Sequence, residues 1–240
     1  MLNDRPGGRR QRGVLFDVDG TLVDSAYIHA ISWWRAFRQA GFDIPMAEIH
    51  RSVGMGGDRL VDHLLPADRD RTGDDEVLAA HGAVFATYWP ALRAFDGAKD
   101  LLAQCCESGL AVALASSARK RDLKALRATL GADSYLHAAT SADDAKHGKP
   151  EPDILIAALG ALELGAADTV YVGDSVWDVY AAAKLSIPTI GVTCGGTSPG
   201  ELREAGAVEV YSGPRELLDN LRDSAIGRLL ARPDSGSQPA

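Results

Sequence analysis

The sequence has little cysteine, and its cysteines lack the spacing of a structural site. The three cysteines are Cys105, Cys106 and Cys194, and no two of them form a CxxC pair. An odd number without such spacing argues against both a disulfide framework and a zinc site. We therefore expect a reducing, cytoplasmic compartment.

Long apolar runs and an excess of positive charge are also missing. No stretch reaches the length of a transmembrane helix, and the arginine-bearing N-terminus has no apolar signal-peptide core. The formal net charge of -8 argues against nucleic acid or an anionic membrane as a partner. An anionic small molecule is still compatible with this charge, because a local metal site can override the global field.

The chain alternates short apolar runs with helical patterns. The expected strands are Gly13–Phe16, Ala111–Ala115, Thr169–Val172, Thr189–Val192 and Val208–Val210. The expected helices between them are Ala98–Glu107, Lys120–Leu130, Pro152–Leu159, Val176–Lys184, Glu201–Glu204 and Arg215–Arg222. Continuous apolar strands that alternate with helices predict an α/β fold, a Rossmann-like parallel sheet with helices on both faces.

One long segment interrupts this alternation. Residues 25–95 carry helical patterns, such as His29–Ala40 and Glu76–Tyr88, but no convincing strand. We predict a helical cap in this segment, inserted after the first strand, and an α/β core formed by residues 13–24 and 96–225. Residues 1–12, with their arginines, are predicted to be a disordered tail. Residues 226–240 are predicted to be a C-terminal tail that is disordered from about residue 231.

The most informative motif is the run Val14–Ser25, in which an apolar strand leads into Asp17, Val18, Asp19, Gly20 and Thr21. Two acids at positions i and i+2 of a strand lie on the same face. The Gly-Thr pair that follows places them at the carboxyl end of the strand, where ligands bind in open α/β sheets. Because the two acids repel each other, they indicate a bound cation or an acid–base role.

Three further strand ends or turns carry polar residues. Ser116 and Ser117 follow the second expected strand, and a hydroxyl beside a helix N-terminus suits a phosphate oxygen as well as a helix cap. Lys149 lies between glycine and proline in a turn, where it is either a solvated charge or a cation for a carboxylate and phosphoryl oxygens. Asp174 follows the third expected strand and Asp178 opens the next helix. Mg²⁺ prefers a few carboxylate oxygens, and Asp17 and Asp174 supply them.

In this order the four motifs resemble those of the haloacid dehalogenase superfamily, and the resemblance covers Val14 to Leu221. It implies that Asp17 attacks the phosphoryl group to form an aspartyl-phosphate, while Asp19 acts as general acid and base. It implies Mg²⁺ held by Asp17, the backbone carbonyl of Asp19, and Asp174, with Asp178 in support of the metal's water shell or of Lys149. The phosphoryl oxygens would be held by Gly20, Thr21, Ser116, Ser117 and Lys149.

The resemblance is to the phosphoglycolate-phosphatase-like branch, whose helical cap follows the first motif. It implies a Mg²⁺-dependent phosphatase for a small phosphorylated metabolite, either phosphoglycolate or a sugar phosphate. A β-phosphoglucomutase-like mutase is the alternative, and a non-catalytic phosphate-binding protein is a further one. Arg51, Gly56 and Arg59 lie in a glycine-rich stretch of the cap that would select the substrate, or else form a flexible linker.

Overall fold

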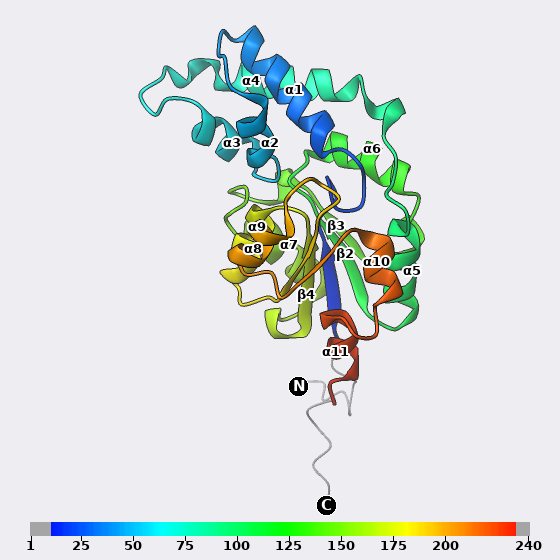
Figure 1. Cartoon of the computed structure of the whole chain (residues 1–240). Coiled ribbons are helices and arrows are strands. Elements are labelled where there is room, and N and C mark those ends of the chain that lie inside the picture. Colours follow the sequence, from blue (N-terminus) through cyan, green and yellow to red (C-terminus); the bar gives the residue numbers. More distant parts are fainter. Residues whose placement is uncertain (1–10, 234–240) are drawn as a thin grey trace, which may run out of the picture.

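The computed structural model describes residues 11–233 and contains one six-stranded parallel sheet with the order β3-β2-β1-β4-β5-β6 (Figure 1). The strands are β1 (Gly13–Phe16), β2 (Ala111–Ala115), β3 (Ala138–Thr140), β4 (Thr169–Gly173), β5 (Thr189–Val192) and β6 (Glu209–Tyr211). The central strands are buried on both faces, as their continuous apolar runs predict. The predicted α/β class is confirmed.

Helices cover both faces of the sheet. One face is covered by α5 (Ala98–Glu107), α6 (Lys120–Leu130), α10 (Pro214–Asp219) and α11 (Ala225–Ala231), and the other by α7 (Asp153–Leu162), α8 (Val176–Ala183) and α9 (Pro199–Ala205). Side chains of β1 alternate between the two layers, since Val14 and Phe16 pack in the first and Leu15 packs in the second.

The segment between β1 and α5 forms a separate helical layer. It contains α1 (Ala26–Gln39), α2 (Met46–Ser52), α3 (Gly57–Leu64) and α4 (Asp74–Ala86), with a small apolar core of its own around Trp33, Phe37 and Ile49. This cap lies above the carboxyl ends of the strands (Figure 1).

The chain enters and leaves the cap through two segments that lie side by side. The Asp24 amide donates to the Arg93 carbonyl at 2.9 Å, and the Phe95 amide donates to the Leu22 carbonyl at 2.9 Å. These two bonds join the crossing points into a short two-stranded connection between core and cap. Within residues 11–233, no helix has both the length and the apolar character that a membrane span requires.

Most predicted elements are present with shifts of a few residues at their ends, but β3 was missed. Its three residues are only partly buried, apart from Thr140, and they form an edge strand too short for a strand pattern. The prediction that the C-terminal tail starts at residue 226 is also wrong, because Ile226 and Leu229 are buried in α11.

The predicted N-terminal tail extends too far as well. Arg12 is buried, its guanidinium donates to the Leu230 carbonyl at 3.1 Å, and its own carbonyl accepts from Ala111 at 2.8 Å. It is therefore part of the core and not a solvated residue. Residues 1–10 and 234–240, which complete the two predicted tails, lie outside the described residues.

Truncation of Ile226 tests the role of α11. The side chain is fully buried against the sheet, so Ile226→Ala is expected to lower the free energy of unfolding by about 2–5 kcal/mol. Urea denaturation measures the change, with exposed Arg232→Ala as the control. Equal stability of both variants would show that α11 is not part of the cooperative core.

Candidate active site

The predicted site residues meet at the carboxyl edge of the sheet. Asp17 follows β1, Ser116 follows β2 and Asp174 follows β4, and these strands are in register, with Phe16 beside both Leu114 and Val172. The polar residues that follow each strand therefore emerge at the same level, and the loop before α7 adds Lys149.

Lys149 is the buried cation of this site, not a solvated loop residue. Its side chain is 0% exposed, and its Nζ lies 2.5 Å from Asp17 Oδ1 and 2.7 Å from Asp178 Oδ1. Burial by itself would lower the pKa of Lys149, but the charges of Asp17 and Asp178 outweigh burial and raise that pKa. The ammonium group therefore stays protonated and fixes both carboxylates.

Asp178 joins the site to the start of α8. Its Oδ2 accepts from the Ser175 amide at 3.0 Å and the Ser175 hydroxyl at 2.7 Å, which makes a capping box. Its Oδ1 accepts from the Tyr171 hydroxyl at 2.7 Å. Asp178 therefore both caps the N-terminus of α8 and forms an ion pair with Lys149. Ser175 and Tyr171 were not predicted, since a helix cap and a strand tyrosine carry no catalytic signal.

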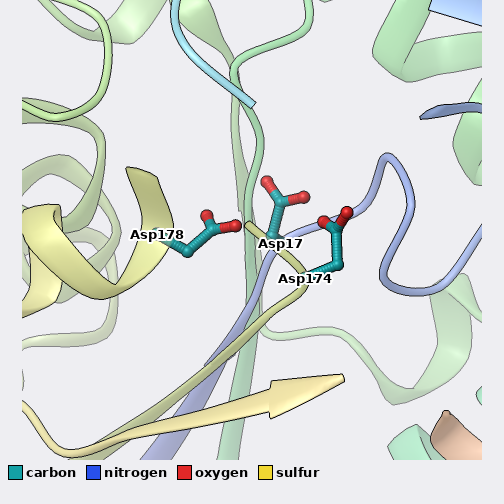
Figure 2. A group of neighbouring side chains, drawn as sticks. All are labelled: Asp17, Asp174 and Asp178. Carbon is teal, nitrogen blue, oxygen red and sulfur yellow. The ribbon is translucent and has the colours of Figure 1, made fainter. Parts of the chain in front are cut away.

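Three buried carboxylates converge beside Lys149. Asp17, Asp174 and Asp178 each bring an oxygen to within 4.8 Å of the others, and Figure 2 shows the three side chains around a common space. Burial raises the pKa of Asp17 to about 7, although Lys149 opposes the rise. Burial, together with Asp178 and Asp17, raises the pKa of Asp174 well above its usual range. Three carboxyl groups face a single ammonium group here, so the site has an excess of negative charge when all of them are ionised.

Asp19 points away from this cluster, toward the cap. Its Oδ1 accepts from the Ser25 hydroxyl at 2.6 Å and contacts His29 Nε2 at 3.0 Å. Burial acts to raise the pKa of Asp19, but His29 and Ser25 outweigh burial and lower it. These contacts favour the carboxylate form of Asp19 in the free site.

Sequence reasoning missed His29. The signal that points to it is its place four residues after Ser25, one turn into α1, where the His29 amide donates to the Ser25 carbonyl at 2.8 Å. A side chain in that turn faces back toward the motif that precedes the helix.

The residues predicted to hold phosphoryl oxygens differ in their surroundings. Ser116 is fully buried at the end of β2, and its hydroxyl accepts from the Ala118 amide at 3.0 Å. Ser117 does not cap α6, which begins after Arg119, and its hydroxyl donates to the Gly54 carbonyl of the cap at 3.5 Å. The Thr21 hydroxyl donates to Asp174 Oδ1 at 3.0 Å. Gly20 has a φ of 77°, and a Cβ there would strike the Asp174 carboxylate.

A cavity of about 260 Å³ opens between core and cap beside Asp17 and Asp19. Its other polar lining residues are His29, Asp58, His81, Ser117, Arg119, Asp122 and Asp143, and Trp33, Leu60 and Leu78 are among its apolar ones. This volume suits a small metabolite and not a polymer. We call it the reaction cavity below.

The structure does not bring the predicted cap residues into this cavity. Arg51 lines a second cavity of about 550 Å³ on the Asp174 side, and Arg59 lines neither of the two. Gly56 lies against the core, since a Cβ added to it would be 2.5 Å from the Gly148 Cα. Its lack of a side chain is therefore needed for close contact between cap and core.

Hydrogen bonds hold the cap against the core around these cavities. The Trp177 indole donates to the Arg51 carbonyl at 2.8 Å, and the Arg121 guanidinium donates to the Gly82 carbonyl at 2.9 Å. His50 Nε2 lies 3.0 Å from the Gly195 carbonyl. The reaction cavity is thus covered by a cap that contacts the core on several sides.

Comparisons with known proteins agree with this geometry. The family of haloacid dehalogenase-like hydrolases matches residues 11–185. Phosphoglycolate phosphatase of Yersinia pestis is 33% identical over 191 residues, which cover 77% of this chain and 82% of the relative. Validoxylamine A 7'-phosphate phosphatase of Streptomyces hygroscopicus subsp. limoneus is 29% identical over 182 residues, which cover 75% of this chain and 84% of the relative.

A similar fold is found in the crystal structure of a hydrolase from Pseudomonas syringae. That structure has a TM-score of 0.85 and 29% sequence identity, and the match covers 90% of this chain and all of the other. The family match spans the strands that carry Asp17, Ser116 and Asp174, the turn that carries Lys149, and the whole inserted cap. With its motifs assembled at one edge of the sheet, this chain belongs to the haloacid dehalogenase-like hydrolases.

Proposed function

We propose that this protein is a Mg²⁺-dependent phosphatase that hydrolyses a small phosphorylated metabolite through an aspartyl-phosphate on Asp17. The observation that carries the proposal is the arrangement around Lys149. The buried Lys149 forms ion pairs with Asp17 and Asp178, and the carboxylate of Asp174 lies next to both acids. A phosphoryl group adjacent to such a site meets a nucleophile and a positive charge together.

The residues present fit a magnesium ion. Asp17 and Asp174 offer hard oxygen ligands. Burial and the neighbouring acids raise the pKa of both carboxyl groups, which means that a cation bound between them would stabilise their ionised forms. With the Asp19 backbone carbonyl, these groups would hold the ion, and Asp178 would support it. When bound, Mg²⁺ supplies charge neutralisation for the phosphoryl oxygens and keeps Asp17 ionised.

In the first half of the reaction, a carboxylate oxygen of Asp17 forms a bond to phosphorus while the bond from phosphorus to the leaving oxygen breaks. Asp19, a carboxylate in the free site, takes up a proton from solvent before this step and gives it to that oxygen, so the product leaves as an alcohol. Lys149 and Ser116 at the edge of the sheet orient the phosphoryl oxygens.

In the second half, a water molecule attacks the phosphorus of the aspartyl-phosphate, and the bond from phosphorus to Asp17 breaks. Asp19, now a carboxylate, accepts the proton of that water, and inorganic phosphate leaves. The hydrogen bonds from Ser25 and His29 suit this half, because they hold Asp19 as the base.

For the substrate we propose a hydroxyl-rich phosphate ester, such as a sugar phosphate, in preference to phosphoglycolate. Beyond Asp17 and Asp19, the reaction cavity is lined by the carboxylates of Asp58, Asp143 and Asp122, of which Asp122 is paired with Arg121. Its one lining guanidinium is that of Arg119. Carboxylates accept hydrogen bonds from hydroxyl groups and repel a second carboxylate.

Removal of the nucleophile tests the reaction itself. Asp17→Asn is expected to lower phosphate release by at least about 1,000-fold, because an amide cannot form the acyl-phosphate. The assay measures phosphate release from p-nitrophenyl phosphate and from sugar phosphates, with Mg²⁺ and with EDTA. Near-normal activity of Asp17→Asn would contradict the mechanism.

Conversion of β-glucose 1-phosphate to glucose 6-phosphate, without phosphate release, would favour the mutase.

Thermal unfolding tests the metal site without an activity readout. Mg²⁺ at about 100 times its Kd should stabilise the wild type by about 2.7 kcal/mol, seen as a rise in Tm over the value in EDTA. Asp174→Asn removes one of the repelling carboxylates, so it should raise the Tm in EDTA and abolish most of the rise with Mg²⁺. Exposed Asp68→Asn is the matched control. An unchanged Mg²⁺ response in Asp174→Asn would remove Asp174 from the metal site.

Substrate preference tests the charge of the reaction cavity. The wild type should show a kcat/KM at least about tenfold higher for its best hexose or pentose phosphate than for phosphoglycolate, equivalent to about 1.4 kcal/mol. Asp58→Asn should narrow this ratio, because it removes one repelling carboxylate from the cap side of the cavity. A wild-type preference for phosphoglycolate would overturn the substrate assignment while leaving the phosphatase intact.

A further inference from the structure

A second cap histidine continues the contact that begins at Asp19. His29 Nε2 lies 3.0 Å from Asp19 Oδ1, and His29 Nδ1 lies 3.1 Å from His81 Nε2. His29 belongs to α1, His81 belongs to α4, and Asp19 belongs to the core. Three groups from three elements thus form one line of contacts that crosses from the core into the cap.

Aromatic packing fixes the planes of both imidazole rings. His29 stacks on Phe85 with ring centroids 3.9 Å apart, and His81 stacks on Trp33 at 3.9 Å. A stacked ring is restrained against tilting, but stacking alone does not decide which edge of the ring faces Asp19. That choice is made by hydrogen bonds in the plane of the ring.

The hydrogen bonds in this line depend on one another. An Asp19 carboxylate only accepts, so His29 Nε2 donates to it, and the remaining nitrogen of His29 needs a partner of its own. Burial lowers the pKa of His81 well below its usual range, and His29 and Arg119 add to this effect. The Nε2 atom of a neutral His81 carries either a hydrogen or a lone pair, depending on the tautomer. It can therefore donate a hydrogen bond to His29 Nδ1 or accept one from it.

Loss of His81 would leave His29 poorly held. His29 is buried, and a buried ring nitrogen without a hydrogen-bond partner is unfavourable. A rotation of the ring that brings this nitrogen toward cavity water would break the bond to Asp19. The position of Asp19 would then rest on Ser25 alone.

We propose that His81 is a positioning residue, which acts through His29 to hold Asp19 in place for proton transfer. The inference rests on the proposed phosphatase mechanism and adds a residue to it. Because α4 supplies His81 and α1 supplies His29, the acid–base residue is held in place when both helices are packed over the sheet. Helix α4 of the cap thus acts on proton transfer through a side chain that contacts His29 and lines the reaction cavity.

Two aryl phosphates of similar shape separate proton transfer from binding. Phenyl phosphate needs a proton on its leaving oxygen, whereas p-nitrophenyl phosphate releases a stable anion that needs none. The ratio of their kcat/KM values, measured in the full-length protein with Mg²⁺, therefore reports how well Asp19 is placed. A general fault in cavity shape or folding lowers both values and leaves the ratio unchanged.

Three substitutions of His81 distinguish its hydrogen bond from its packing. His81→Phe keeps a ring on Trp33 but removes the bond to His29. His81→Gln keeps an amide that can donate or accept at a similar reach, and His81→Asn carries the same amide on a side chain too short for the contact. Exposed His63→Gln is the control for loss of a cap histidine.

His81→Phe and His81→Asn are expected to lower kcat/KM for phenyl phosphate by about 10–100-fold, and that for p-nitrophenyl phosphate by less than about 3-fold. His81→Gln should recover most of the loss, and His63→Gln should match the wild type. Equal losses for both esters, no loss, or a failure of glutamine to restore the ratio would each overturn the role of His81. Wild-type inactivity toward both esters would instead contradict the proposed function.

Discussion

The site depends on the double ion pair of one buried lysine. Lys149 is fully enclosed and lies between Asp17 and Asp178, so neither carboxylate is compensated without it. Removal of one partner from a buried pair commonly costs about 3–5 kcal/mol, because the other charge remains buried. The capping box of α8 and the Tyr171 hydroxyl hold Asp178 in turn, which makes the start of that helix part of the same network. The contacts of Lys149 and Asp178 therefore stabilise the fold and also hold the residues of the proposed reaction in place.

A second constraint is that Asp19, the proposed acid–base residue, is held jointly by core and cap. Asp17 and Lys149 are fixed by the sheet and its loops, but Asp19 takes its hydrogen bonds from Ser25, at the start of the cap, and from His29 in α1. The proposed nucleophile, Asp17, and the proposed proton donor, Asp19, are thus held by different parts of the fold. A change in the position of the cap would therefore alter the contacts of Asp19 more directly than those of Asp17.

The sequence was sufficient for the central strands of the sheet and for the residues that follow them at its carboxyl edge. Apolar runs and strand-end acids locate β1, β2 and β4, and with them Asp17, Ser116 and Asp174. It was insufficient where a role depends on contacts between distant segments. β3 is too short and too exposed for a pattern, and α11 is stabilised by burial against the core. The pairing of His29 with Asp19 depends on how α1 leaves the core, and the distance of Arg51 from the reaction cavity depends on how α2 packs.

The paired crossing points at Leu22–Asp24 and Arg93–Phe95 have a consequence for how such proteins diversify. Because the chain leaves and re-enters the core at adjacent, hydrogen-bonded segments, the entire insert between them can be exchanged without a change in strand order. Recombination at these two points would transfer a complete cap, together with the Ser25 and His29 contacts of Asp19, onto an unchanged sheet. The same junctions are natural boundaries for chimeric enzymes that combine this core with the cap of a relative.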